Sequence, residues 1–256
     1  MGEPKEECRP FVEMPPLISE RRLASGYSSF WRRVLPLGDA YARYLNGGAE
    51  SFAAPLTTTL DPSRGAIVSE LSFRTFEWLL ANQGAFERAE ISRATERTLL
   101  ESTLAYLKRL DPRISEEALT SADVILAAEL TRRLQVFLKE RKVAASSIVA
   151  RPRFPGCGRL SSCEADVCWG YTLCEIKNVE RPFRLVDIKQ ILVYLALNAA
   201  ARQGPLHNVV LLNLRSGRFV ASGVGDLCIG LGAVGVLELL AEIVDFVVED
   251  DPYALA

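Results

Sequence analysis

The chain has 256 residues, of which 49% are hydrophobic and 24% charged, and its formal net charge at pH 7 is −2. That length and composition are typical of a globular protein with one large domain or two small ones. The beginning of the sequence has no apolar run for secretion, and the most apolar late segment, residues 231–248, carries acids at helical spacing, so we expect a cytoplasmic protein without a membrane span.

The first half of the chain is expected to be mainly helical. Apolar residues recur at three- and four-residue steps in residues 29–45 and again in residues 90–110. Pro112 ends the second of these helices, and acids typical of a new helix start follow it. We therefore place a domain boundary there, between a mainly helical N-terminal domain of unknown role, residues 1–112, and a second domain, residues 113–256.

The second half alternates helices with strands. Its apolar residues change between helical and strand spacing, and glycines mark the turns. This order predicts an α/β domain with a central mixed sheet flanked by helices. In chain order, the expected elements are a helix at 123–141, a strand at 147–154, a hairpin at 164–177 turning at Gly170-Tyr171, a helix at 186–202, a hairpin of 208–214 with 218–222 turning at Ser216-Gly217, and a final helix after Gly223.

The hairpin at 164–177 carries the strongest sign of chemistry. Alternate side chains of a strand project to the same face, so Glu175 and Lys177 lie together, while the residues beside them point into the core. The turn brings Asp166 alongside them from the first arm. Two carboxylates and a lysine at one place in a sheet form a site for a hard divalent cation, because Mg²⁺ prefers carboxylate oxygens. The alternative is an ion-pair ladder across two exposed strands.

Basic residues are in excess around this hairpin. Residues 141–190 contain nine Lys or Arg against five Asp or Glu, although the whole chain is slightly acidic. A locally positive surface attracts a polyanionic partner such as nucleic acid, whereas an ordinary solvated surface could have the same composition. Both interpretations stay open at this point.

Polar residues of the second half follow one another in a characteristic order of elements. In chain order they are a helix with Glu129, a strand with Asp166, a strand with Glu175-Ile176-Lys177, and a helix with Gln190 and Tyr194 one turn apart. This arrangement resembles the PD-(D/E)xK, or restriction-endonuclease-like, nuclease superfamily. The Gln-x-x-x-Tyr helix is similar to that of its RecB-like and Cas4-like branch. The resemblance covers residues 120–250, and Ala165 stands where the superfamily motif has proline.

The resemblance implies a restriction-endonuclease-like core within residues 113–256 and a metal site. The implied cofactor is Mg²⁺ or Mn²⁺, which acidifies a water molecule and stabilises charge on the phosphate. By the resemblance, the metal is held by Asp166, Glu175 and the main-chain carbonyl of Ile176, with Glu129 completing the shell, while Lys177 orients the attacking water and Gln190 and Tyr194 position the site or a phosphate.

The implied activity is that of a metal-dependent deoxyribonuclease, which hydrolyses phosphodiester bonds of DNA. Bacterial restriction or anti-phage defence is the commonest setting for such a nuclease, and this step rests on analogy alone. DNA is the expected partner, and an ATPase or helicase, another defence component or a second copy in a homodimer would also be compatible. One alternative is a non-catalytic nucleic-acid-binding or protein-interaction module that retains the nuclease fold. Another is an RNA-directed nuclease, with Trp169, Tyr171 and Phe183 as nearby aromatic candidates.

Three other patterns are weaker. Residues 230–235 spell Gly-x-Gly-x-x-Gly, but a dinucleotide-binding fold needs a further strand and an acid about twenty residues later, so we expect a glycine-rich connection. The six cysteines lack the Cys-x-x-Cys spacing of zinc and iron–sulfur sites, so we expect free thiols. His207 is the only histidine, which excludes a multi-histidine metallohydrolase within one chain.

Overall fold

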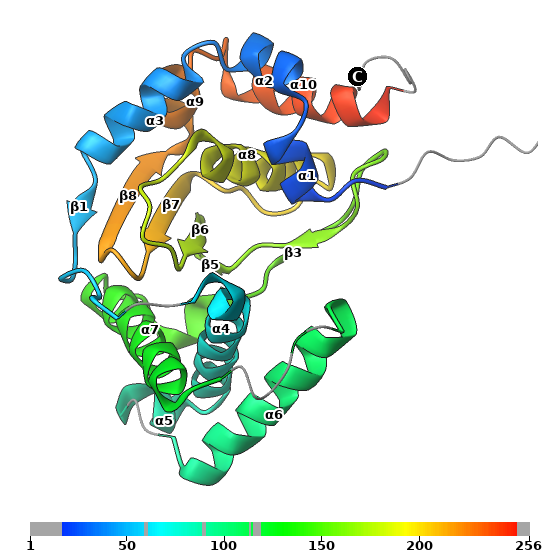
Figure 1. Cartoon of the computed structure of the whole chain (residues 1–256). Helices are drawn as coiled ribbons and strands as arrows, with labels where there is room; N and C mark the ends of the chain where they lie inside the picture. Colours follow the sequence, from blue (N-terminus) through cyan, green and yellow to red (C-terminus); the bar gives the residue numbers. More distant parts are fainter. Residues whose placement is uncertain (1–16, 59–60, 89–90, 113, 115–118, 250–256) are drawn as a thin grey trace, which may run out of the picture.

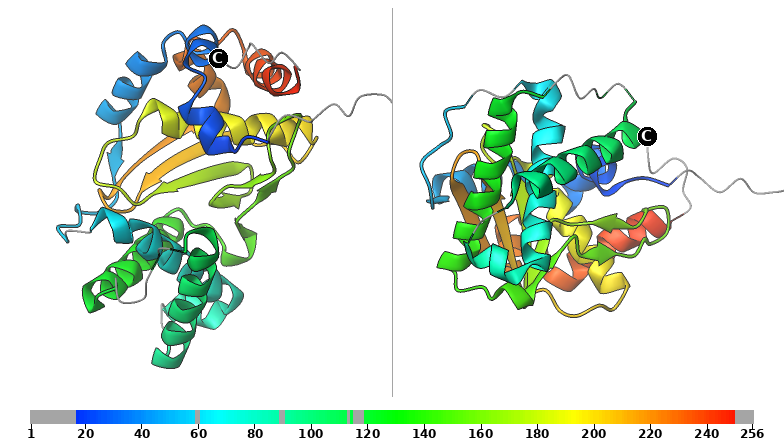
Figure 2. Two further views of the ribbon diagram at one scale, coloured as in Figure 1. Left: turned by 45° about the vertical axis from the view of Figure 1, so that its right-hand side comes forward. Right: turned by 90° about the horizontal axis from the view of Figure 1, so that it is seen from below.

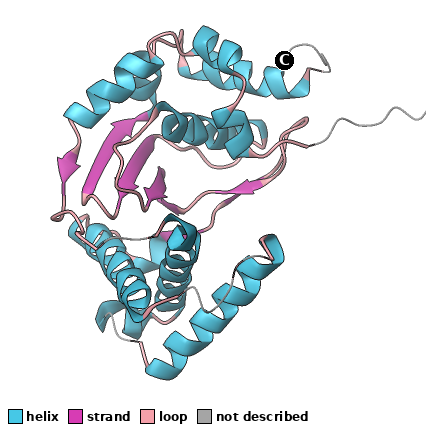
Figure 3. Cartoon of the chain, viewed as in Figure 1, coloured by secondary structure: helices cyan, strands magenta, loops and turns pink. Residues whose placement is uncertain are grey.

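The computed structural model describes residues 17–58, 61–88, 91–112, 114 and 119–249. Its centre is a six-stranded sheet with helices on both faces (Figures 1 and 3). The strands of this sheet and of a separate two-stranded ribbon, β3–β4, are β1 (Glu50–Ser51), β2 (Ile148–Ala150), β3 (Arg153–Phe154), β4 (Cys163–Glu164), β5 (Val167–Trp169), β6 (Thr172–Lys177), β7 (Asn208–Asn213) and β8 (Arg218–Gly223).

The helices lie in two groups, one on each face of the sheet (Figures 1 and 2). The first group contains α1 (Glu20–Ser25), α2 (Ser28–Val34), α3 (Gly38–Gly47), α8 (Leu185–Ala200), α9 (Val224–Gly230) and α10 (Val236–Val248). The second group contains α4 (Gly65–Ala81), α5 (Gln83–Arg88), α6 (Arg93–Leu110) and α7 (Ser121–Glu140), and short 3₁₀ turns are η1 (Pro62–Arg64) and η3 (Ala145–Ser147).

The strand order of the large sheet is β1-β8-β7-β6-β5-β2. Neighbouring strands are antiparallel except β6 and β7, which are parallel and are joined through α8. A parallel pair needs a crossover of this kind, because its second strand starts at the end where the first one started. The molecule is therefore mixed α/β, with a mixed central sheet flanked by helices, as the sequence predicts.

Both predicted hairpins are confirmed. In the β5–β6 hairpin, Val167 pairs with Cys174 and Trp169 with Thr172, so the turn falls at Gly170-Tyr171. In the β7–β8 hairpin, Gly217 occupies the turn with φ +68°. A Cβ atom there would lie 2.0 Å from the carbonyl oxygen of Ala53, so the turn needs glycine for its backbone angle and for the close approach.

The two long helices expected in the second half are also confirmed, and side chains fix where they start. Thr120 and Asp123 form a reciprocal capping box at the start of α7. At the start of α8, the carboxylate of Asp187 accepts the backbone N–H of Arg184 at 2.8 Å. Most of α8 is buried, because it lies between the sheet and α10 (Figure 1). Its apolar residues consequently surround the whole helix.

Three segments differ from the sequence predictions. The strand expected at 147–154 is divided into β2 and β3, which belong to different sheets, because Arg151 has φ +49° and Pro152 follows it. The helix expected at 29–45 is divided at Pro36 into α2 and α3. The helix α4 has no counterpart among the predicted elements, since its sequence is apolar over most of its length.

Two hydrophobic cores lie on the two faces of the sheet. The first contains Trp31 of α2, much of α8 and Leu173 of β6. The second contains Phe76 of α4, much of α7 and Cys174 of β6. Alternate residues of β6 therefore serve opposite cores. Helices from before and after residue 112 contribute to both cores, and β1 pairs with β8, so the cores do not follow the division expected between residues 112 and 113.

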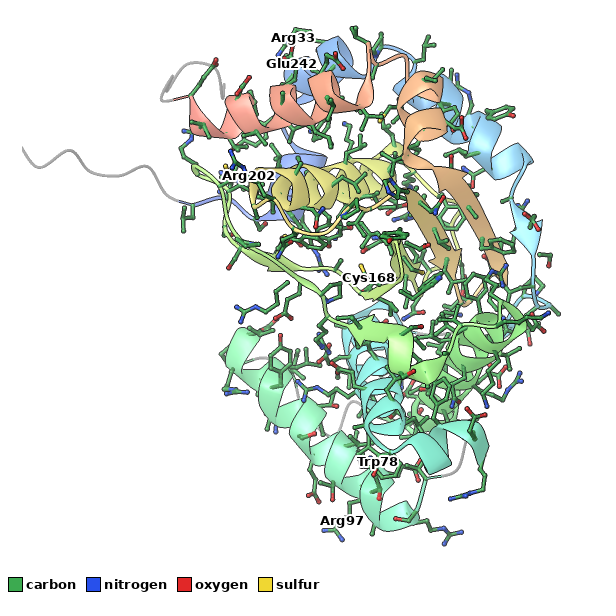
Figure 4. The ribbon with its side chains drawn as sticks, turned by 180° about the vertical axis from the view of Figure 1, so that it is seen from behind. Arg33, Trp78, Arg97, Cys168, Arg202 and Glu242 are labelled. Atoms are coloured by element: carbon green, nitrogen blue, oxygen red, sulfur yellow. The ribbon has the colours of Figure 1, made fainter. Side chains whose placement is uncertain are left out.

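The ends of the described chain are joined at the surface of the first helical group. Arg33 of α2 donates to Glu242 of α10 at 2.8 Å, and both side chains are labelled in Figure 4. Side chains from the two helices also stack, because the rings of Phe30 and Phe246 lie 4.1 Å apart between centroids. Among the residues that the structure describes, no helix is long and apolar enough to cross a membrane.

Candidate active site

A cavity of about 810 Å³ opens beside the β5–β6 hairpin. Its walls come from both halves of the chain, namely from α1, α4 and α6 and from the hairpin and α8. The side chains that matter most for its chemistry are Arg21, Glu70, Phe73, Tyr106, Arg151, Asp166, Glu175, Lys177 and Gln190. The three hairpin residues predicted as a site therefore do meet in one cavity.

Asp166 lies immediately before β5 and is held by main-chain hydrogen bonds. Its carboxylate accepts the N–H of Ile176 at 2.6 Å, and its carbonyl oxygen accepts the N–H of Arg151 at 2.9 Å. Burial raises the pKa of the Asp166 carboxyl, against the opposing effect of the Ile176 hydrogen bond. The cross-strand bond to Ile176 fixes this carboxylate next to β6.

Glu175 occupies the middle of β6 and is only 4% exposed. Its Oε1 atom accepts a hydrogen bond from the ammonium of Lys177 at 2.8 Å. Its Oε2 atom is buried and has no hydrogen-bond partner among the described residues. Burial, reinforced by the nearby charge of Asp166, raises the pKa of Glu175 to about 8. An unpaired buried carboxylate oxygen is costly, so this position favours either a proton or a bound cation.

Lys177 is held by acceptors from β6 and from α8. Besides Glu175, its Nζ atom donates to the amide oxygen of Gln190 at 2.9 Å, and an Asp187 oxygen lies 3.6 Å away. The Gln190 amide in turn donates to the hydroxyl of Tyr194 at 2.7 Å. The two polar residues predicted on this helix are thus connected to the lysine, and their spacing of one turn aligns them.

Asp187 is a member of this network that the sequence prediction missed. Arg181 donates to both of its oxygens, at 2.7 and 2.9 Å. Burial would raise the pKa of Asp187, but these hydrogen bonds and the one from the Arg184 amide lower it overall. The carboxylate therefore stays charged beside Lys177. Its position in the first turn of α8 was the signal in the sequence, and it was compatible with a simple helix cap.

Glu129 does not line the cavity. It lies on α7, where it binds Arg132 through two hydrogen bonds of 2.7 and 2.8 Å and Arg133 through one of 3.1 Å. Arg133 also donates to the carbonyl oxygens of Leu214 and Ala54. The hydrogen bond from Arg132, opposed by partial burial, lowers the pKa of Glu129. The observed role of Glu129 is to anchor these two arginines rather than to join Asp166 and Glu175.

The helix carboxylate that does line the cavity is Glu70 of α4. Its Oε1 atom accepts hydrogen bonds from Arg74 and Arg151, both at 2.8 Å. Arg151 also donates to Glu77 at 3.0 Å. The only charged residues of α4 are these two acids and Arg74, at intervals of four and three residues on an apolar helix. That spacing was a usable signal, because it places all three on one face.

The aromatic residues considered for RNA lie elsewhere. None of Trp169, Tyr171 and Phe183 is among the residues that line the cavity. Trp169 packs against the second core, Tyr171 is exposed beside His207, and Phe183 is buried near α3. The described part of the chain instead places Phe73 and Tyr106 in the cavity wall.

The weaker sequence patterns have structural explanations. The five described cysteines are free thiols, and Cys8 lies outside the described residues. A Cβ atom on Gly230 would lie 2.1 Å from the Tyr41 ring, and Gly232 has φ +77°, so these glycines serve packing and turning. Within the described ranges, no group of three or more His, Cys, Asp or Glu side chains is arranged to hold a metal. The site around Asp166 would use two carboxylates.

Comparison of the chain with protein-family models, with curated proteins and with solved structures finds no match in any of the three. The chemical argument for a function is therefore carried by the geometry of the cavity.

Proposed function

We propose that the protein is a metal-dependent nuclease that hydrolyses phosphodiester bonds of DNA, and that its sheet with α7 and α8 is a restriction-endonuclease-like core. The observation that carries this proposal is the meeting of Asp166, Glu175 and Lys177 in one cavity, where a buried oxygen of Glu175 has no hydrogen-bond partner among the described residues. A divalent cation and a positive side chain of this kind can stabilise the negative charge that develops when a phosphodiester is hydrolysed.

The donor set fits Mg²⁺ or Mn²⁺. Asp166 is half-buried and Glu175 is buried, and desolvation raises both carboxyl pKa values, so a divalent cation held by the two would relieve the cost of their charges. The main-chain carbonyl of Ile176 is a further hard oxygen ligand that the resemblance supplies. When bound, the metal would supply Lewis-acid chemistry, which acidifies water and neutralises charge on a phosphate.

The side chains around Lys177 support a positioning role for α8. The ammonium is held by Glu175 and by Gln190, and Tyr194 holds the Gln190 amide from the next turn. In this proposal the ammonium donates to a phosphate oxygen and stabilises the negative charge that develops there. Gln190 and Tyr194 act through Lys177 and keep it at the cavity.

The second candidate is a non-catalytic nucleic-acid-binding module with the same fold. The observation that favours it is the 2.8 Å ion pair between Lys177 and Glu175, since a lysine that neutralises this carboxylate occupies part of the role of a cation. Restriction or anti-phage defence, with an ATPase or helicase partner, remains a proposal that depends on the nuclease assignment.

The test is cleavage of supercoiled and linear DNA by the purified full chain with Mg²⁺, Mn²⁺ or EDTA. We expect metal-dependent cleavage that falls at least about 100-fold in Glu175→Gln and in Lys177→Ala. The matched controls are Glu242→Gln, at a residue that pairs with Arg33 at the surface (Figure 4) and does not line the cavity, and Lys142→Ala, an exposed lysine. No cleavage by the wild type together with no Mn²⁺ binding in titration calorimetry, or cleavage that both variants retain, would favour the binding module instead.

A further inference from the structure

We propose that the wall of the cavity formed by α4 and α6 is a subsite for an unpaired nucleobase, with Phe73 and Tyr106 as its stacking residues. This inference rests on the proposed function for the nature of the ligand, and it names the part of the substrate that the cavity selects. The strand that enters would place a phosphate at the hairpin residues and a neighbouring base on the aromatic wall.

The cavity has two chemically different sides. The hairpin side carries the charged groups Asp166, Glu175 and Lys177. The side formed by α4 and α6 carries two aromatic rings and the aliphatic side chains of Leu107 and Leu110, with Glu70 as its charged residue. A nucleotide has the same two parts, an anionic phosphate and an apolar planar base. A volume of about 810 Å³ also lies in the range of small-molecule sites.

The two rings are held in place by arginines and by apolar packing, since Phe73 packs against the second core and Tyr106 against a smaller cluster that contains Leu104 and Leu107. Phe73 and Tyr106 are each partly exposed, whereas Phe76 of the same α4 helix is fully buried. The guanidinium of Arg74 lies 4.7 Å from the centre of the Tyr106 ring, and that of Arg151 lies 4.8 Å from the centre of the Phe73 ring. Rings fixed in this way lose little conformational entropy when a base stacks on them.

Positive side chains lie beside both rings, where acids balance their charge. The two arginines both bind Glu70, which fixes them at the wall, and Arg151 has a further bond to Glu77. Arg21 of α1 lines the cavity with a largely exposed side chain. Positive groups that alternate with aromatic rings are typical of grooves that follow a single strand of nucleic acid.

The arrangement discriminates between paired and unpaired bases. In a duplex the bases face each other and the phosphates face outward, so a duplex at the hairpin residues would present no base face to Phe73 or Tyr106. An unpaired nucleotide presents both groups at once. The cavity therefore selects single strands, flaps or ends rather than continuous duplex.

The test measures binding, so that it does not depend on cleavage. Fluorescence anisotropy is recorded in EDTA with the full chain carrying Glu175→Gln, which removes one negative charge from the cavity and prevents turnover. The probes are a labelled DNA strand of about 12 nucleotides, the same strand with abasic sites, and its duplex. The additional substitutions are Tyr106→Ala, Phe73→Ala and Tyr106→Phe, with Tyr44→Ala, an exposed tyrosine of α3, as the control.

We expect Tyr106→Ala and Phe73→Ala each to weaken binding of the base-containing strand about 10-fold, and to leave binding of the abasic strand unchanged. Tyr106→Phe and Tyr44→Ala should bind the strand as tightly as the Glu175→Gln protein without a further substitution, which is the parent. Thermal unfolding establishes that each variant is folded. The inference is overturned if the abasic and base-containing strands respond alike to Tyr106→Ala, if the parent binds duplex more tightly than single strand, or if the parent binds no strand.

The two proposals fail separately. Metal-dependent cleavage by the wild type, with strand affinity unchanged in Tyr106→Ala and Phe73→Ala, removes the base subsite and keeps the nuclease. Ring-dependent strand binding without cleavage in Mg²⁺ or Mn²⁺ removes the nuclease and keeps the subsite.

Discussion

At the residue scale, the cavity concentrates negative charge away from water. Glu175 is buried beside the half-buried Asp166, and among the described residues Lys177 is the cation that binds Glu175 directly. Such a site destabilises the metal-free protein at neutral pH, because the folded state must either bind a proton that the unfolded chain does not hold or keep a buried charge. In the proposed function, a bound cation would offset this cost.

The pH dependence of stability follows from the raised pKa of Glu175. The group titrates near 4.5 when the chain is unfolded and near 8 when it is folded, so the folded state prefers the protonated form. Its contribution therefore falls as the pH rises from about 4.5 to about 8, and Asp166 acts in the same direction. The melting temperature of the wild type in EDTA should therefore fall as the pH rises through this range. We expect a smaller fall for Glu175→Gln, which has no carboxyl group to titrate at this position.

The control for that measurement is Glu242→Gln, which removes a surface carboxylate and should keep the pH dependence of the wild type. Adding Mn²⁺ near the upper end of the range should raise the melting temperature of the wild type more than that of Glu175→Gln, because a ligand stabilises the state that binds it. Equal pH profiles for wild type and Glu175→Gln would contradict the buried-charge explanation.

We predict different effects on metal affinity for substitutions at two carboxylates on helices. Glu70 lines the cavity, whereas Glu129 is occupied by Arg132 and Arg133 outside it. We expect Glu70→Gln to weaken Mn²⁺ binding roughly 10-fold, since neighbouring carboxylates tune a site by about that much, and Glu129→Gln to leave it nearly unchanged. Titration calorimetry on the two variants distinguishes them. The reverse order of effects would restore Glu129 to the metal shell.

At the element scale, the turns were predictable from the sequence because glycine has a direct effect on backbone angles. The β5–β6 and β7–β8 hairpins, α7 and α8 all follow from local patterns. The helix α4 does not, because its apolar sequence has little alternation and its partners, such as Arg151, are far away in the chain. The break between β2 and β3 depends on the left-handed backbone conformation of Arg151, which could not be predicted from the residue type, because arginine rarely adopts it.

The residues of the site divide in the same way into those that local sequence predicts and those that only tertiary packing brings together. Asp166, Glu175 and Lys177 were predictable because one hairpin carries all three. Glu70 and Tyr106 reach the cavity only through the packing of α4 and α6, which is tertiary information. Local sequence therefore predicts the residues of the hairpin and not the opposite wall.

Two turn glycines allow the effect of a close contact on stability to be separated from the effect of backbone strain. Gly217 and Gly170 both have positive φ, but a Cβ atom would meet the carbonyl of Ala53 at Gly217 and nothing within 4 Å at Gly170. We expect Gly217→Ala to lower the free energy of unfolding by at least about 2 kcal/mol, and Gly170→Ala by about 1 kcal/mol from backbone strain alone. Urea denaturation measures both, and equal losses would contradict the contact with Ala53.

At the scale of the whole molecule, one sheet serves two cores that both halves of the chain build. Removing the first 112 residues would take Trp31 from the first core and Phe76 from the second. We expect a fragment of residues 113–256 to lack cooperative unfolding and to bind a hydrophobic dye, while the full chain unfolds in one transition. Cooperative unfolding of this fragment, followed by circular dichroism, would instead support two independent domains.

The pairing of β1 with β8 also has a consequence for the order of events during synthesis. The first strand of the sheet leaves the ribosome long before its neighbour, and α1 waits similarly for α8. The cavity is lined by residues of α1 and of α8, so a nascent chain that has not yet formed α8 carries its carboxylates and lysine without the enclosure that arranges them. Any hydrolytic activity of the proposed kind would consequently arise only after α8 has been synthesised and has packed against α1.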